Sequence, residues 1–98
     1  MKNKIFNTYV KEVCRLFGIS NDMLFTKIKR RDVVDARQLL FYLCRERQMS
    51  VRYIQEYMMD NGFSIHHSTI GYGINNVEKK MVNDKDWLEN VQEIINEG

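Results

Sequence analysis

Two adjacent histidines, His66 and His67, are followed by two hydroxyl residues in the segment SIHHSTIGYGI, residues 64–74. These residue types could bind a metal ion, form a nucleophile with its base, or bind an anion. A helical metal site places its ligands three or four residues apart, because adjacent residues point about 100° apart on a helix. The spacing therefore disfavours a metal site, and we expect no metal ion here.

Catalysis is also disfavoured by the spacing. Side chains that are neighbours in sequence seldom face each other, and the nucleophile elbow G-x-S-x-G is absent from the chain. The five glycines also do not form the phosphate loop G-x-x-x-x-G-K. We therefore expect no enzyme activity, no catalytic residue, no cofactor and no small-molecule substrate.

Anion binding suits the segment better. A helix N-terminus presents unpaired N–H groups and a partial positive charge, which attract phosphate. Ser64, Ser68 and Thr69 would add hydroxyl donors, and His66 and His67 would add ring N–H groups. Such donors can hold DNA phosphates and reach base edges. In the alternative interpretation Ser64 only caps the helix and the histidines are solvated; from this stretch alone the two are evenly balanced.

A second candidate lies upstream, where KIKRR supplies Lys27, Lys29, Arg30 and Arg31 within five residues. The net charge of the chain is only +2, but residues 27–52 carry eight basic and three acidic side chains. A basic loop of this kind can insert into the electronegative minor groove of DNA. The alternative is a solvated run of charges, which is common on protein surfaces.

The elements that must position these residues are helices. Apolar residues recur at helical spacing almost throughout, and no run shows sustained strand alternation. We expect an all-α single domain over residues 1–98 with about six helices, the fourth and fifth forming a helix-turn-helix; the alternative is a plain helical bundle. Ser20, Asp32 and Ser50 are the expected caps of the second, third and fourth helices, and the third helix, apolar around most of its girth, is expected at the centre.

Four small residues also carry expectations. Cys14 and Cys44 lie on apolar stripes, which predicts reduced core thiols rather than a disulfide or metal ligands. Gly71 and Gly73 lie inside the predicted fifth helix, where each costs about 1 kcal/mol relative to Ala. Either a helix or a DNA strand approaches this backbone closely, or the helix is locally weak. The sixth helix should place Trp87, Leu88, Val91, Ile94 and Ile95 on one face.

The segments VVDARQLLFYLCRE, SVRYIQEYM and HHSTIGYGINNVEKKM together resemble the C-terminal DNA-binding domain of DnaA, the bacterial replication initiator family. The resemblance runs from about residue 8 to residue 95. It implies a six-helix fold akin to that of the Trp repressor, with the fifth helix in the major groove and the basic loop in the adjacent minor groove.

Carried over residue by residue, the resemblance implies that His67, Ser68 and Thr69 contact bases and phosphates. Lys29 falls where the family places a minor-groove arginine, and Arg37 matches the arginine of its ARQ motif. The full set of expected DNA-binding residues is Lys27, Lys29, Arg30, Arg31, Arg37, Ser64, His66, His67, Ser68, Thr69, Tyr72, Asn75, Asn76 and Lys79.

The chain departs from the family pattern at several positions. His66 replaces an acidic residue that reads a base, Gln55 replaces a common glycine, and Tyr72 stands where a histidine can occur. The turn MMDNGFSI is longer than in a typical member. Lys29 also lacks the planar fork of an arginine. These changes predict an altered or relaxed sequence preference.

We therefore expect a stand-alone double-stranded DNA-binding protein without the initiator's ATPase domain, with a role in replication or transcription regulation. Partners besides DNA would be a second copy or a replication protein. No apolar run approaches the roughly 20 residues of a membrane span, and the charged start is no secretory signal, so we expect a cytoplasmic, nucleoid-associated protein. The rival is a protein-interaction module that kept the fold, favoured by the acidic residues Asp84, Asp86, Glu89, Glu93 and Glu97.

Overall fold

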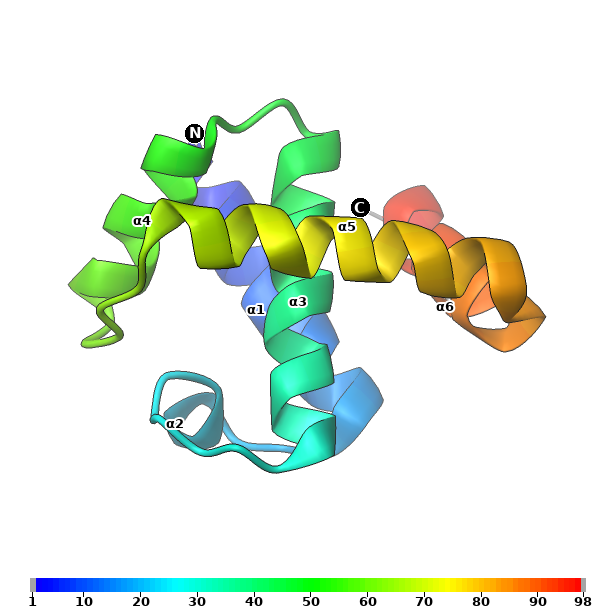
Figure 1. Ribbon diagram of the computed structural model, residues 1–98, viewed down its shortest axis with the longest axis horizontal. Coiled ribbons are helices and arrows are strands. Elements are labelled where there is room, and N and C mark those ends of the chain that lie inside the picture. The colour runs from blue at the N-terminus through cyan, green and yellow to red at the C-terminus, as the bar shows by residue number, and fades with distance from the viewer. Residues whose placement is uncertain (1, 98) are drawn as a thin grey trace.

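A computed structural model describes the backbone of residues 2–97 and the side chains of residues 3–96. Over this range the chain forms six helices and no strand, which confirms the all-α fold (Figure 1). Helices α4 and α5 are joined by a short turn, as a helix-turn-helix requires. The helices are α1 (Lys2–Phe17), α2 (Asn21–Leu24), α3 (Arg31–Glu46), α4 (Val51–Asp60), α5 (His67–Asn83) and α6 (Lys85–Glu97).

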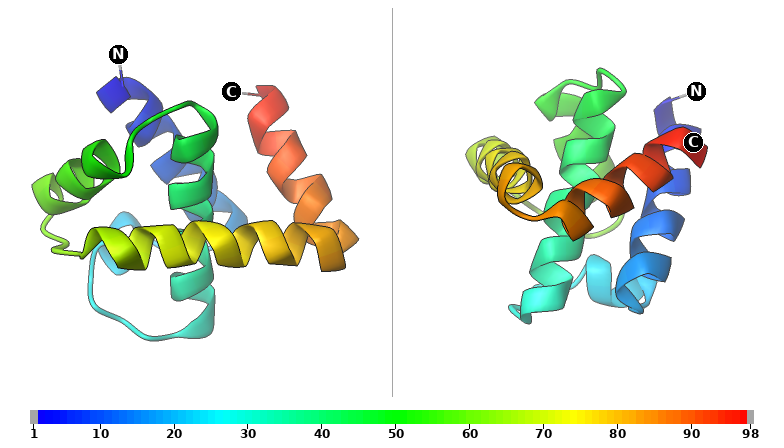
Figure 2. Two further views of the ribbon diagram at one scale, coloured as in Figure 1. Left: turned by 45° about the horizontal axis from the view of Figure 1, so that its top comes forward. Right: turned by 90° about the vertical axis from the view of Figure 1, so that its right-hand side faces the viewer.

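Helix α3 forms the centre of the molecule, as its apolar girth predicted. It packs against α1 on one side and α5 on the other (Figure 2, right). Leu39, Leu40 and Leu43 are fully buried between these neighbours. A helix that is apolar around most of its circumference is stable only when it is covered in this way. The central position of α3 therefore fixes where α5 presents its outer face.

Two of the three predicted caps are confirmed. The hydroxyl oxygens of Ser20 and Ser50 each accept a hydrogen bond, over 3.2 Å, from the backbone N–H three residues on. The prediction for Asp32 was wrong, because α3 already begins at Arg31 and Arg30 occupies the capping position without a side-chain bond. Asp32 lies in the first turn, where it accepts from the Val33 N–H at 2.9 Å and pairs with Arg30.

Helix α6 follows the far end of α5 (Figure 1), and Lys80 near that end contacts it. The Lys80 ammonium lies 2.6 Å from a carboxylate oxygen of Asp35 on α3 and 4.7 Å from the centre of the Trp87 ring on α6. Val91 and Ile94 are buried and Trp87 is half-buried, but Ile95 is 36% exposed. Leu88 is half-buried as well, and Ile95 lies on the same helical face by its spacing but is only partly covered.

Both cysteines are free and buried, which confirms the prediction of reduced core thiols. Burial raises the pKa of Cys14 and raises that of Cys44 to about 12. Neither thiol therefore ionises near neutral pH. Among the described residues, no helix combines the length and the apolar character needed to cross a membrane.

Candidate nucleic-acid interface

Helix α5 begins with a histidine cap. His66 occupies the N-cap position, and its ring Nδ1 accepts the backbone N–H of Ser68 over 3.2 Å. The Ser68 hydroxyl oxygen lies 2.7 Å from the same nitrogen, and the rings of His66 and His67 stack with centroids 4.4 Å apart. The alternative in which Ser64 caps this helix was wrong. The cap fixes the His66 ring at the end of the helix.

The residues of α5 that are predicted to contact DNA lie together on its outer face. His67, Ser68 and Thr69 are all exposed in its first turn, while Ile70 and Val77 turn into the core. Farther along, the Tyr72 side chain is 64% exposed, Asn75 and Lys79 are exposed, and Asn76 is half-buried. One polar stripe of the helix is therefore open to a ligand that lies alongside it.

The two helical glycines have different surroundings. A Cβ atom added at Gly73 would lie 3.0 Å from Gln38 Cγ and 3.2 Å from Phe41 Cδ2, so this glycine lets α5 approach α3 closely. A Cβ atom added at Gly71 would meet no atom within 4 Å. The close approach predicted for this backbone is therefore made by α3 at Gly73, and Gly71 stays open.

The turn before α5 is held by two hydrogen bonds. Phe63 is buried and its N–H donates to the carbonyl of Met58 at 2.9 Å. The Gln55 side chain donates from Nε2 to the carbonyl of Ile65 at 2.8 Å. A glycine at position 55 would leave that carbonyl without this donor. The glutamine therefore supports the conformation of this turn.

The basic loop docks on this same turn (Figure 2, left). The Lys27 ammonium donates to the carbonyl of Ser64 over 2.6 Å and lies 4.6 Å from the centre of the Phe63 ring. Both contacts join residues far apart in the sequence. The loop is thereby held beside the N-terminus of α5.

Arg37 requires a correction, because its burial argues against the predicted DNA contact. Its side chain is only 7% exposed, and the guanidinium donates to the carbonyls of Leu24 at 2.7 Å, Ile28 at 3.2 Å, Met23 at 3.4 Å and also Thr26. Desolvation lowers its pKa, but an arginine stays charged at neutral pH. Arg37 therefore shapes the basic loop from within.

The remaining loop cations differ in their availability. Arg30 makes a two-pronged contact with Asp32, at 3.0 and 2.7 Å, which raises the pKa of Arg30 and lowers that of Asp32. Arg31 is 87% exposed and lies 3.8 Å from Asp35, which Lys80 already holds. Lys29 is exposed and has no partner among the described residues. Lys29 and Arg31 are thus the loop cations best placed to meet a ligand.

A hollow of about 440 Å³ lies between α3 and the outer face of α5. Arg31 and Gln38 line it from α3, and Tyr72, Asn76 and Lys79 line it from α5. Asp35 also lines it but is paired with Lys80, so Arg31 and Lys79 leave the hollow positively charged and able to take a sugar–phosphate strand, because their donors match phosphate oxygens. Sequence reasoning missed Gln38, which only the packing of α3 on α5 reveals.

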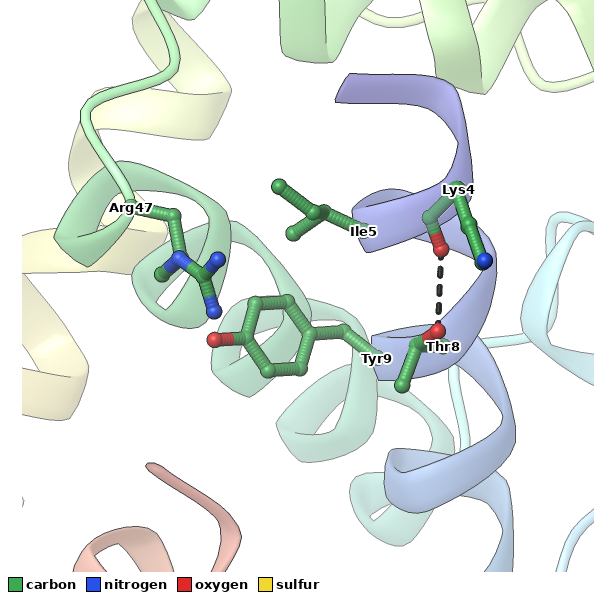
Figure 3. Close-up of a pocket in the computed structure, with 5 residues that line it drawn as sticks. All are labelled: Lys4, Ile5, Thr8, Tyr9 and Arg47. Atoms are coloured by element: carbon green, nitrogen blue, oxygen red, sulfur yellow. Dashed lines mark hydrogen bonds between the residues drawn. The ribbon is translucent and has the colours of Figure 1, made fainter. Parts of the chain in front are cut away.

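A different hollow lies between α1 and the end of α3 (Figure 3). Lys4, Ile5, Thr8, Tyr9 and Arg47 line it, and its volume is about 150 Å³. The Thr8 hydroxyl donates to the Lys4 carbonyl of its own helix over 2.9 Å. The predicted DNA-binding residues do not line this hollow, so it is separate from the surface described above.

Comparisons with known proteins identify the family of this chain. Residues 7–77 match the family described as the bacterial DnaA protein helix-turn-helix. The chain belongs to this family. It is also 34% identical, over 73 residues, to the chromosomal replication initiator protein DnaA of Oleidesulfovibrio alaskensis. This match covers 74% of the chain and 15% of that relative.

Membership in the DnaA helix-turn-helix family implies binding to double-stranded DNA, and the family is a DNA-binding domain rather than a catalytic one. Among the described residues, no group of three or more His, Cys, Asp or Glu side chains is placed to hold a metal ion. The matched residues run from α1 through most of α5. They include both the basic loop and the turn that holds it.

Proposed function

We propose that this protein binds double-stranded DNA with sequence preference, through α5 in the major groove and the basic loop in the adjacent minor groove. The observation that carries the proposal is the bond between Lys27 and the Ser64 carbonyl, 2.6 Å long. It supports a single surface in which the loop cations and the first turn of α5 are held together.

The two parts of this surface suit the two grooves. The major groove admits an α-helix, and each base pair presents a distinct pattern of donors and acceptors there. His67, Ser68 and Thr69 would meet it at the end of α5. The narrow minor groove attracts cations such as Lys29 and Arg31. The sugar–phosphate strand between the grooves would cross the hollow of Gln38 and Asn76.

The positions of the acidic residues favour this proposal over the protein-interaction module. Asp84, Asp86, Glu89 and Glu93 belong to the α6 end of the molecule, at the opposite end of α5 from its cap (Figure 1). Helix α5 has 17 residues, so its ends are roughly 25 Å apart at about 1.5 Å per residue. At physiological salt charges are screened over about 8 Å. Repulsion by these side chains of DNA held at the cap of α5 is therefore weak. The Glu97 side chain lies outside the described residues.

We further propose a regulatory role in replication or transcription, in which the protein occupies its sites in competition with other binders. A homodimer or a replication protein would be its partner besides DNA. The named relative is a replication initiator, which supports a role near replication. A module this small makes few base contacts, so a partner would raise its affinity.

The test is the salt dependence of duplex binding, measured by fluorescence anisotropy for the wild type and for a variant with Lys29→Ala and Arg31→Ala. The slope of log K against log salt should decrease by about 0.9 for each phosphate that the variant no longer neutralises. A matched control replaces Lys11 and Lys85, which are exposed on α1 and α6. An unchanged slope in the loop variant would remove the loop from the interface.

His67→Ala and Ser68→Ala test the other half of the surface. Each substitution should change the preferred base at one position of the site. A base-reading contact contributes about 1–3 kcal/mol of discrimination against the wrong base. If both variants kept the wild-type preference, α5 would not be the reader. If neither heparin nor duplex DNA retained the wild-type protein, the protein-interaction module would be favoured.

A further inference from the structure

We infer that His66 is a specificity-determining residue that donates a hydrogen bond from its Nε2–H to an acceptor on a base edge in the major groove. The inference rests on the proposed function. It adds the direction of the hydrogen bond, and with it the base that is excluded, to the general expectation of DNA binding.

The cap of α5 fixes which nitrogen carries the proton. Nδ1 of His66 accepts the backbone N–H of Ser68 over 3.2 Å. A neutral imidazole has one donor nitrogen and one acceptor nitrogen. An accepting Nδ1 therefore places the proton on Nε2. The Ser68 hydroxyl, 2.7 Å from Nδ1, can donate to the same nitrogen and favours the same tautomer.

The His66 ring is also held in orientation. It is bonded at one edge by the cap and stacked on His67, with 4.4 Å between centroids and 28° between planes. His66 is nevertheless exposed, and Nε2 has no hydrogen-bond partner among the described residues. An oriented donor without a partner, next to the exposed Ser68 and Thr69, can bind an acceptor with little loss of side-chain entropy.

A fixed donor discriminates among bases. In the major groove, guanine presents two acceptors, O6 and N7, whereas cytosine presents only the N4 donor. Adenine and thymine each present one acceptor there, N7 and O4. His66 should therefore reject cytosine at the position it faces and accept guanine most readily.

The first experiment selects binding sites from a random double-stranded library with the wild type and with His66→Asp. Asp caps helices well but its carboxylate only accepts, so the fold is kept while the direction of the hydrogen bond is reversed. The wild type should deplete cytosine at one position. His66→Asp should lose that exclusion by about tenfold and enrich cytosine there, with the other positions unchanged.

The outcomes separate this inference from the proposed function. An enriched motif that is identical in the wild type and in His66→Asp would overturn the inference alone. No enrichment by the wild type would overturn the proposed sequence preference and the inference with it. His66→Asn caps with its oxygen but can also donate, so it should relax the preference rather than reverse it.

A second measurement needs no variant and no DNA. Long-range ¹H–¹⁵N correlations of the histidine rings in the free protein report which nitrogen is protonated. The Nε2–H tautomer is expected for His66. The Nδ1–H tautomer would overturn the inference, because it cannot accept the Ser68 N–H.

Discussion

Lys27 and Ser64 are 37 residues apart in the sequence, yet the Lys27 ammonium lies 2.6 Å from the Ser64 carbonyl oxygen. The same ammonium lies over the Phe63 ring. These contacts attach the basic loop to the turn before α5. The loop and the recognition helix can then meet DNA as one rigid unit, which reduces the entropy lost on binding.

Lys27→Ala should weaken DNA binding while the fold survives. The variant loses one cation and releases the loop from the turn, but exposed ionic contacts contribute less than about 1 kcal/mol to stability. Anisotropy titrations and urea denaturation measure the two effects. Lys11→Ala removes the same charge from exposed α1 and should bind DNA nearly as the wild type does. Equal affinities of the two variants would contradict the docking role.

Replacement by methionine should lower the stability of the fold at Arg37 and the affinity for DNA at Arg31. Arg37→Met leaves buried loop carbonyls without donors and should lower the free energy of unfolding by about 1–3 kcal/mol. Arg31→Met changes an exposed residue and should weaken DNA binding at nearly unchanged stability. Denaturation curves and DNA titrations on both variants decide this. Wild-type stability in Arg37→Met, combined with an absence of DNA binding, would restore Arg37 as a direct contact.

Gly71→Ala and Gly73→Ala should differ in the sign of their effect on stability. At Gly71 a methyl group meets open space, so the variant should gain about 0.5–1 kcal/mol from helix propensity. At Gly73 it presses on Phe41, which is only 2% exposed, so the variant should be less stable than the wild type. Thermal denaturation compares the stability of the two variants directly. Equal stabilisation of both variants would mean that the side chains of α3 shift to accommodate the methyl group at position 73.

Stability should fall as the pH rises above about 9, and Cys44 should contribute to the fall. The unfolded thiol loses its proton near the ordinary pKa of 9.0, whereas burial raises the pKa of Cys44 in the folded protein to about 12. Between these values the folded state binds more protons, so the free energy of unfolding decreases with rising pH. Below about pH 9 the contribution is complete.

Urea denaturation between about pH 8 and pH 11 measures this dependence. Cys44→Ala should show a shallower decrease than the wild type, although Tyr42, whose pKa is also raised to about 12 by burial and by Glu46, retains part of it. Parallel pH profiles of the two proteins would rule out a contribution from Cys44.

Much of the fold could be predicted from the sequence because its signals are local. The helical spacing of apolar residues and the serines at positions 20 and 50 fix elements within a few residues of themselves. The role of Arg37 could not be predicted, because its carbonyl partners lie up to 14 residues away, in α2 and in the loop that follows it. His66 was also missed as a cap, because Ser, Thr, Asp and Asn are the usual residues there. The roles of Arg37 and His66 depend on tertiary packing and local geometry, which the sequence pattern does not show.

The most direct test of a single two-groove surface is an NMR titration of the ¹⁵N-labelled protein with a duplex obtained by selection. The largest amide shift changes should fall on residues 27–31 and 66–72, with little change along α6. Amide shift changes concentrated on α6 would contradict a surface built from the basic loop and α5. Changes in the first turn of α5 without changes in the basic loop would contradict it as well.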